Sequence, residues 1–346
     1  MHETRSHETT SIEPGTKGET PARRPARRRR IDMRALSPFI ALAVLLVLGA
    51  FTSPVFLSVE NLTNVATRAS FIAIIAVGAT FVIAAGGLDL SVGSMAALTA
   101  GVMILAMNAV GGADVSTIAI GMAVALGVAL ACGLFNGLVV TFGRIEPFIV
   151  TLGGMGIYRA LVVFLAAGGT ITMTDWDLRE TYRPIYFGDV LGVPIPVIVF
   201  LVVAAVAAVV LYKTPFGRHV VAIGSNEDVA RFSGVPIRRV RTLTYVIQGL
   251  CVGIAILVYV PRLGSATPTT GLLWELQAIT AVVIGGTALK GGTPFVWGTV
   301  VGALILELVA NIMVLSDFVS EYLVGAVQGA IIIIAMLVQR SLQRGR

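Results

Sequence analysis

A few polar side chains interrupt the long apolar stretches of this chain, and they are its first candidates for a functional site. The charged ones are Arg159, Glu275 and Glu307, and the neutral ones are Asn136, Gln248, Gln277 and Asn311. Charges inside a membrane are costly and usually face the bundle interior, where they mark substrate or ion pathways. Neutral amides offer donors and acceptors that suit hydroxyl groups. The same residues also fit a structural role as links between helices, with Arg159 and Glu275 as a buried pair.

Two glycine-rich breaks in the apolar pattern are further candidates. The first, Ala84–Ser94, reads AAGGLDLSVGS and contains Asp89, and the second is Val282–Thr299. Irregular backbone at membrane depth is tolerated only where it is buried in protein or lines a cavity. Asp89 therefore fits either of two roles, hydrogen bonding to freed backbone N–H groups or contact with a hydroxylated substrate. The second break fits close helix packing, a tight turn or a hinge.

One long polar run, Lys213–Arg241, lies between apolar stretches of membrane-spanning length. Its middle reads as a short helix, because Ser225 precedes Asp228 with the spacing of a capping box. Gly234 supplies a left-handed C-terminal stop, and Pro236 prevents the helix from continuing. The spacing therefore predicts about two turns of helix between these signals.

This short helix has two interpretations. Val229 and Phe232 share one side of it, as residues three apart do. It is either an ordinary capped helix in a surface loop or a docking helix that a cytoplasmic partner grips. The residues assigned to docking are Gly224, Ser225, Asn226, Glu227, Asp228, Ala230, Arg231 and Gly234.

The motifs of common enzyme sites are absent from the sequence. There is no G-x-x-x-x-G-K-[ST] phosphate loop, no H-E-x-x-H metal motif and no nucleophile elbow. Cys132 and Cys251 lie in apolar stretches without metal-ligand spacing and read as small core residues. We therefore predict that the chain is not an enzyme and that it holds no cofactor or metal.

The composition predicts an all-α polytopic membrane protein. Of the 346 residues, 56% are hydrophobic and 13% are charged, whereas soluble domains carry about 25% charged residues. The apolar runs are continuous rather than alternating, which excludes a β-barrel. Ten spans are predicted, of which the third and the eighth are short or interrupted. They cover about 35–52, 64–85, 92–109, 116–141, 147–167, 194–212, 241–261, 272–289, 294–315 and 320–338.

Positive charge orients these spans. With the N-terminus inside, the inside segments hold 20 of the 25 Lys and Arg residues, so both termini and the 213–241 loop are predicted to be cytoplasmic. Residues 1–34 form a basic, disordered cytoplasmic tail, and 35–346 form the membrane domain. The largest outside loop, about 168–193, carries Trp176, Tyr182 and Tyr186, which suit a membrane interface or a partner's face. Spans two to five and seven to ten have similar lengths, which suggests an inverted repeat.

Four ordered stretches give the chain a family resemblance. It resembles the membrane permease subunits of bacterial ATP-binding-cassette (ABC) sugar importers of the ribose, xylose and galactose class. The stretches are GGLDLSVGS (86–94), GLFNGLVVTFGRIEPFIVTLGGMGIYRAL (133–161), TPFGRHVVAIGSNEDVARFSGVPIRRVR (214–241) and PRLGSATPTTGLLWELQAITAVVIGGTALKGG (261–292). The resemblance as a whole runs from about residue 35 to the C-terminus.

The resemblance implies a translocation subunit in the bacterial inner membrane. Its partners would be cytoplasmic ATPase subunits that carry the ATP and Mg²⁺, a periplasmic sugar-binding protein and a second permease, identical or similar. The ATPases would grip the segment Gly224–Gly234. We predict a substrate pathway that uses Asp89, Asn136, Phe148, Arg159, Glu275, Gln277 and Asn311.

Two departures from the family pattern leave other substrates open. Glu307 with 308–315, and Thr293–Phe295, stand where neutral or glycine-containing residues are more usual. One alternative is a permease for branched-chain amino acids or another small solute, against which the scarcity of membrane charges argues. A second is an ion-coupled transporter without an ATPase, for which Glu307 is the best titratable carboxylate.

Overall fold

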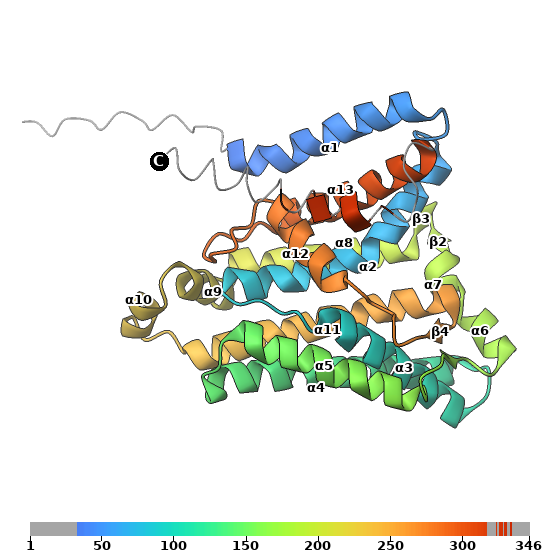
Figure 1. The fold of residues 1–346 in the computed structure, drawn as a ribbon, viewed down its shortest axis with the longest axis horizontal. Helices are drawn as coiled ribbons and strands as arrows, with labels where there is room; N and C mark the ends of the chain where they lie inside the picture. The colour runs from blue at the N-terminus through green and yellow to red at the C-terminus, as the bar shows by residue number, and fades with distance from the viewer. Residues whose placement is uncertain (1–32, 317–322, 324, 328, 331–332, 334–346) are drawn as a thin grey trace, which may run out of the picture. The chain divides into compact units, whose positions relative to one another are not determined.

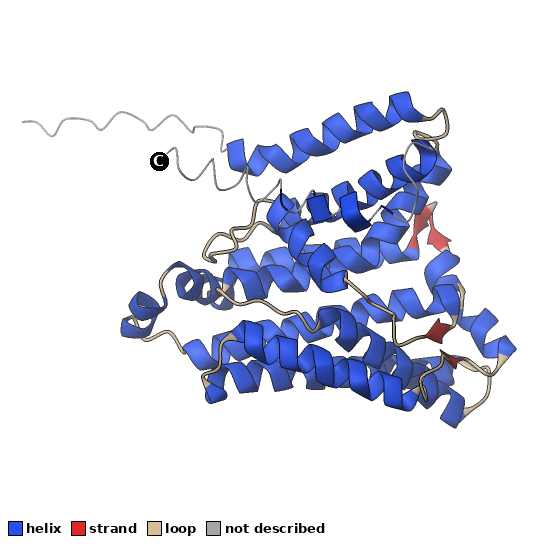
Figure 2. Cartoon of the chain, viewed as in Figure 1, coloured by secondary structure: helices blue, strands red, loops and turns tan. Residues whose placement is uncertain are grey.

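The computed structural model describes residues 33–316, 323, 325–327, 329–330 and 333, and in this part of the chain almost every element is a helix (Figures 1 and 2). The longer helices are α1 (Met33–Thr52), α2 (Val59–Ala84), α3 (Val92–Val110), α4 (Val115–Gly143), α5 (Pro147–Leu165), α8 (Ile195–Lys213), α11 (Ile237–Leu263) and α13 (Val296–Ser316). The shorter ones are α6 (Trp176–Tyr182), α7 (Pro184–Phe187), α9 (Pro215–Ser225), α10 (Glu227–Phe232) and α12 (Trp274–Ile284). The strands are β1 (Ile171–Thr172), β2 (Asp189–Val190), β3 (Val193–Pro194) and β4 (Ser265–Ala266).

The prediction of an all-α polytopic membrane protein is confirmed. Seven helices of the described chain are long and apolar enough to cross a membrane, and Leu36–Thr52 and Trp274–Ile284 are shorter apolar helices. The eighth predicted span is short, as expected, because its helix ends at Gly285–Gly286. The third is not, since α3 runs for 19 residues without a break. Most of the tenth predicted span, 320–338, and the tail before residue 33 lie outside the described residues.

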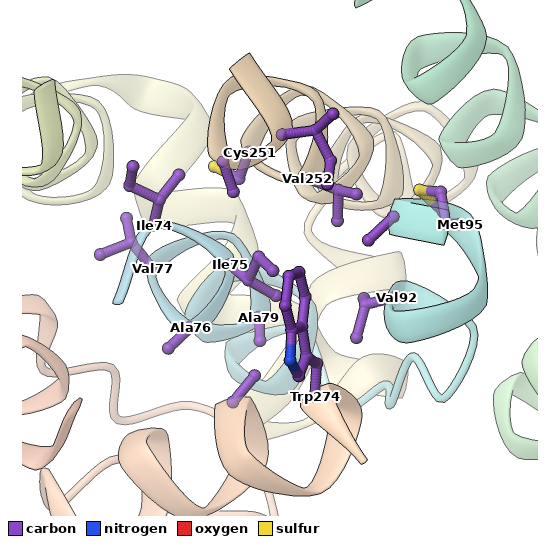
Figure 3. Packing of buried hydrophobic residues seen from close by; sticks show 14 of the residues in the cluster. Ile74, Ile75, Ala76, Val77, Ala79, Val92, Met95, Cys251, Val252 and Trp274 are labelled. Atoms are coloured by element: carbon purple, nitrogen blue, oxygen red, sulfur yellow. The ribbon is translucent and has the colours of Figure 1, made fainter. Parts of the chain in front are cut away.

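Three helices, α2, α3 and α11, form the centre of the bundle. Most of the apolar window of each is buried, whereas only about a third of α4, α5 and α8 is buried. Figure 3 shows the packing between them: Ile75 and Ala79 of α2 lie beside the ring of Trp274, and Cys251 and Val252 come from α11. A helix that is apolar on nearly all faces is usually buried, and here neighbouring helices cover those faces.

Small residues let α4 and α11 approach each other closely. A Cβ added at Gly133 would lie 2.4 Å from the carbonyl oxygen of Tyr245, and one at Gly249 would lie 2.3 Å from that of Ala129. Backbones in such contact leave no room for larger side chains. In a membrane, where burial of apolar surface gives no advantage, this close packing and a hydrogen bond between Thr141 of α4 and Thr242 of α11 hold the pair together.

The loop of about residues 168–193, which the charge pattern predicts to lie outside, is folded onto the bundle. Strand β1 pairs antiparallel with β4, and β2 pairs antiparallel with β3. Tyr182 is fully buried and its hydroxyl donates to the carbonyl of Leu257, while Tyr186 is also buried. The prediction that both tyrosines face a membrane interface or a partner is therefore wrong, because the loop has its own helices that bury them. Trp176 alone of the three is exposed.

Candidate functional site

The predicted docking helix forms as α10, but its cap differs from the prediction. Ser225 is the last residue of α9, and its hydroxyl donates to the carbonyl of Val221. Asn226 has an extended backbone, and its Oδ1 accepts from the N–H of Val229 at 3.0 Å. A cap needs this non-helical backbone, which Ser225 lacks because α9 continues through it. The prediction of Ser225 as the cap is therefore wrong by one residue.

The end and the exposed face of α10 follow the prediction. Gly234 has a φ of +77°, the left-handed stop, and Pro236 precedes α11. Val229 is 60% exposed and Phe232 is 90% exposed, whereas Ala230 is only 3% exposed. An apolar pair this exposed is typical of an interaction surface. Ala230 instead packs α10 against the chain, so its side chain is not part of that surface.

Glu227 pairs with Arg231 of its own helix and with Arg241 of α11, and the second pair connects α10 to α11. Its Oε1 accepts from Arg231 at 2.8 Å, and its Oε2 accepts from Arg241 at 2.6 Å. The hydrogen bond from Arg241 lowers the pKa of the Glu227 carboxyl, and the charges of both arginines add to this effect. Asp228 is mostly exposed and lies 3.7 Å from Arg231. Three ion pairs therefore involve α10, and the pair with Arg241 is the shortest and the least exposed of them.

Gly224 brings the two glycine-rich breaks together. A Cβ at this position would lie 1.8 Å from the carbonyl oxygen of Ala84 and 2.6 Å from the amide nitrogen of Gly292. The N–H of Gly292 also donates to that Ala84 carbonyl at 3.0 Å. Backbone therefore touches backbone where α9, the end of α2 and the second break meet. A displacement of α9 would therefore push directly on the backbone at both glycine-rich breaks.

Asp89 lies at the centre of a buried polar network. Its Oδ1 accepts from both the N–H and the hydroxyl of Ser91, at 2.9 and 2.6 Å. Asn136 of α4 donates to the Ser91 hydroxyl, and Tyr158 of α5 donates to Asn136. Asp89 thus satisfies a freed backbone N–H, which is the structural role, while its Oδ2 is buried and has no hydrogen-bond partner among the described residues. The network joins the first break to α4 and α5.

Arg159 and Glu275 lie near each other but do not form the expected ion pair. The Arg159 guanidinium donates to the carbonyls of Pro268 and Thr270, and no ion pair within 4.0 Å joins it to Glu275 among the described residues. Backbone carbonyls of the 267–273 loop stand between them and satisfy the arginine instead. Glu275 lies in the first turn of α12, against Gly93, and Gln277 is half-buried in the same turn.

The remaining pathway candidates lie elsewhere. Asn311 exchanges two hydrogen bonds with Asn61, at 3.0 and 2.8 Å, and so joins α13 to α2. Phe148 is exposed at the start of α5. Glu307 interacts electrostatically with Arg68 and Arg262, so positive charges face this carboxylate. The structure thus groups Asp89 with Asn136 and places Arg159, Glu275 and Gln277 near one loop, but it separates Phe148 and Asn311 from both.

Sequence reasoning missed Tyr158, Asn61 and Arg241 as members of these contacts. Tyr158 and Asn61 are polar residues in apolar helices, which is a usable signal. No such signal identifies Arg241 as the partner of Glu227, because Arg241 lies 14 residues away on another helix. As a basic residue beside a predicted span, it is already explained by membrane topology. Within the described residues no group of three or more His, Cys, Asp or Glu side chains is placed to hold a metal ion.

Comparison with known proteins places the chain in a family. Residues 61–336 match the family described as "Branched-chain amino acid transport system / permease component". The chain is 37% identical to the ribose import permease of Haemophilus influenzae, over 86% of this chain and 91% of that protein. It is 38% identical to the ribose import permease of Bacillus subtilis (89% and 93%) and 30% identical to the xylose permease of Escherichia coli K12 (89% and 93%).

A solved structure shares the fold. An inward-facing "putative metal-chelate type ABC transporter" superposes with a TM-score of 0.50 at 13% identity, over 89% of this chain and 98% of the other. At that identity the likeness concerns architecture alone. The relatives named above are far more similar in sequence and match over most of their length. The chain therefore belongs to the family of transport-system permease components, the multi-pass inner-membrane subunits of bacterial ABC importers.

Proposed function

We propose that this chain is the translocation subunit for a monosaccharide or related polyol, and that α10 receives the force of separate ATPase subunits. The observation that carries the proposal is the exposed apolar pair Val229 and Phe232 on a helix that Glu227 connects to α11. A partner that covers Val229 and Phe232 would remove their apolar surface from water, which favours binding. The same partner would bind ATP and Mg²⁺, since this sequence has no phosphate loop.

The route from docking to transport runs through Gly224. Force on α10 passes through Asn226 to α9, whose Gly224 touches the end of α2 and the turn at Gly292. Both contacts border the glycine-rich breaks, where helix pairs have room to pivot. The Asp89 network then links the first break to α4 and α5. Alternating access follows if these helices shift as a unit when two docking helices move together.

A second permease copy fits the open face of α5. Phe148, Ile149 and Ile157 are exposed on this helix, and a Cβ added at Gly153 or Gly156 would meet nothing within 4 Å. Small residues with free space beside them allow another helix to approach closely. The two copies would enclose the pathway between them. A sugar-binding protein would deliver substrate on the periplasmic side, opposite the cytoplasmic α10 and the cytoplasmic termini.

The sugar assignment rests on the relatives. The ribose permeases are 37–38% identical to this chain, and the allose and xylose permeases are 30% identical. The family description names branched-chain amino acids, so these remain the second candidate.

The experiment is uptake into proteoliposomes that contain the chain with its ATPase and binding protein. With ATP inside, we expect accumulation of ribose, allose or xylose but not of leucine. Phe232→Asp should abolish both uptake and copurification of the ATPase, because it places a charge in the apolar contact. Leu191→Asp, on the far exposed β2–β3 turn, is the matched control and should preserve both. Leucine uptake, or sugar uptake without ATP, would overturn the proposal.

A further inference from the structure

A cavity of about 730 Å³ lies between α10, the start of α11 and the turn from α4 to α5. These elements share one end of the bundle in Figure 1. The charged residues of its wall are Arg144, Arg231, Arg238, Arg241, Glu146 and Glu227. Four arginines against two glutamates leave an excess of two positive charges. Since Glu227 is already hydrogen-bonded to Arg231 and Arg241, it is unavailable to the other two arginines.

Two of these arginines have no acidic partner. Arg144 and Arg238 form no ion pair with a carboxylate among the described residues. Arg144 is the left-handed C-cap of α4, where the chain turns toward α5. Guanidinium groups donate in a fork that matches phosphate oxygens. A phosphate in the cavity would supply acceptors for Arg144 and Arg238.

The surroundings of the cavity identify the source of that phosphate. Phe142 and Ile145 are exposed beside the arginines, and the Arg238 guanidinium lies over the Phe142 ring at 5.7 Å. Phe142 is the penultimate residue of α4, and only about a third of the apolar window of this span is buried within the chain. Phe142 and Ile145 therefore continue the lipid-facing surface of α4. A ligand with an anionic head group and acyl chains would pair with the arginines through its head group and pack its chains against these apolar side chains.

We propose that the cavity binds the phosphate of an anionic phospholipid such as phosphatidylglycerol. The charge pattern places this end of the bundle at the cytoplasmic leaflet, where anionic lipid attracts basic groups. A lipid held here contacts both the α4–α5 turn and Arg241, the residue that connects α11 to α10. Bound lipid would therefore stabilise the position of the docking helix in the absence of the ATPase.

The test uses thermal unfolding of the purified, delipidated full chain in neutral detergent. Cys132 and Cys251 are the chain's two cysteines and both are buried, so a thiol-reactive fluorogenic dye reports unfolding. We expect phosphatidylglycerol to raise the Tm by several degrees relative to phosphatidylcholine, and inorganic phosphate not to do so. Arg144→Gln with Arg238→Gln should remove most of this shift and weaken lipid binding about tenfold.

The matched control is Arg218→Gln with Arg239→Gln, which removes the same charge from exposed arginines of α9 and α11 outside the cavity. It should keep the shift. Equal shifts with both lipids, or an unchanged shift in the cavity variant, would overturn the proposal. Equal stabilisation by inorganic phosphate would overturn the lipid assignment. Loss of ATPase copurification with lipid binding intact would assign the cavity to that partner instead.

If the cavity variant is too unstable to purify, native mass spectrometry of the wild-type chain decides the question. The chain is offered equal amounts of phosphatidylglycerol and phosphatidylcholine. Selective retention of the anionic lipid supports the proposal, and equal retention overturns it.

Discussion

Arg241 of α11 donates a 2.6 Å hydrogen bond to Glu227 of α10, and this contact connects the docking helix to a central helix of the bundle. Both side chains are only partly exposed, at 20% and 37%, so solvent screens the pair less than it screens most surface pairs. The chain itself joins the two helices at Gly234–Pro236, and the ion pair adds a second connection between them. The ion pair therefore restricts the angle between the two helices.

Glu227→Gln should uncouple ATP hydrolysis from transport. The amide retains its size but loses the charge that holds Arg241, so we expect uptake to fall at least tenfold while the chain stays in the membrane. ATPase activity measured beside uptake in the same proteoliposomes checks this. Asp228→Asn is the control, because Asp228 is exposed and 3.7 Å from its arginine. Equal losses in both variants would contradict a special role for Glu227.

The contribution of Glu227 to stability should depend on pH. Arg241 depresses the folded-state pKa of this carboxyl, so the stabilisation is fully present above the unfolded pKa of about 4.3 and is lost as the pH falls through the folded value. Because the pair is partly exposed, its contribution is below about 1 kcal/mol. Scanning calorimetry should give a constant small Tm difference between wild type and Glu227→Gln from pH 8 to 5. That difference should shrink below about pH 4.5, and a difference independent of pH would count against the ion pair.

Gly224→Ala should impair transport by separating α9 from the two breaks. The added methyl group meets the Ala84 carbonyl and the Gly292 amide, which are backbone atoms and cannot rotate away. We expect loss of uptake and a Tm lowered by several degrees, measured with the thiol dye. Gly127→Ala in α4, where nothing lies within 4 Å, is the control and should be neutral or slightly stabilising. Normal uptake by the Gly224 variant would show that this contact does not carry the motion.

Asp89→Asn and Asp89→Ala should differ sharply. Asparagine retains the oxygen that accepts from Ser91 and replaces the unpartnered Oδ2 by a neutral group, so the Tm should be unchanged or higher. Alanine leaves the Ser91 N–H and hydroxyl without an acceptor, a loss of about 1–3 kcal/mol for each buried group. Thermal unfolding of both variants checks this. Folding of the alanine variant like wild type would contradict the structural role.

Much of the architecture was predictable from local patterns. Continuous apolar runs of about 20 residues predict membrane helices because no other element satisfies its backbone in lipid. Gly234 and Pro236 predicted the end of α10 for equally local reasons. The cap was misplaced by one residue, because Ser225 and Asn226 both have capping side chains and only the backbone, extended at Asn226, distinguishes them.

The sequence by itself determined the seven described helices that are long and apolar enough to cross a membrane, the position of α10 and the family to which the chain belongs. Only the tertiary structure decided which polar residues meet. Asn311 pairs with Asn61, Arg159 binds backbone carbonyls rather than Glu275, and Glu227 finds Arg241. The physical reason is that the apolar pattern of a helix specifies that it is buried but not which neighbour it faces. Helix rotation and packing, which depend on small residues such as Gly133 and Gly249 across the whole bundle, settle those pairs.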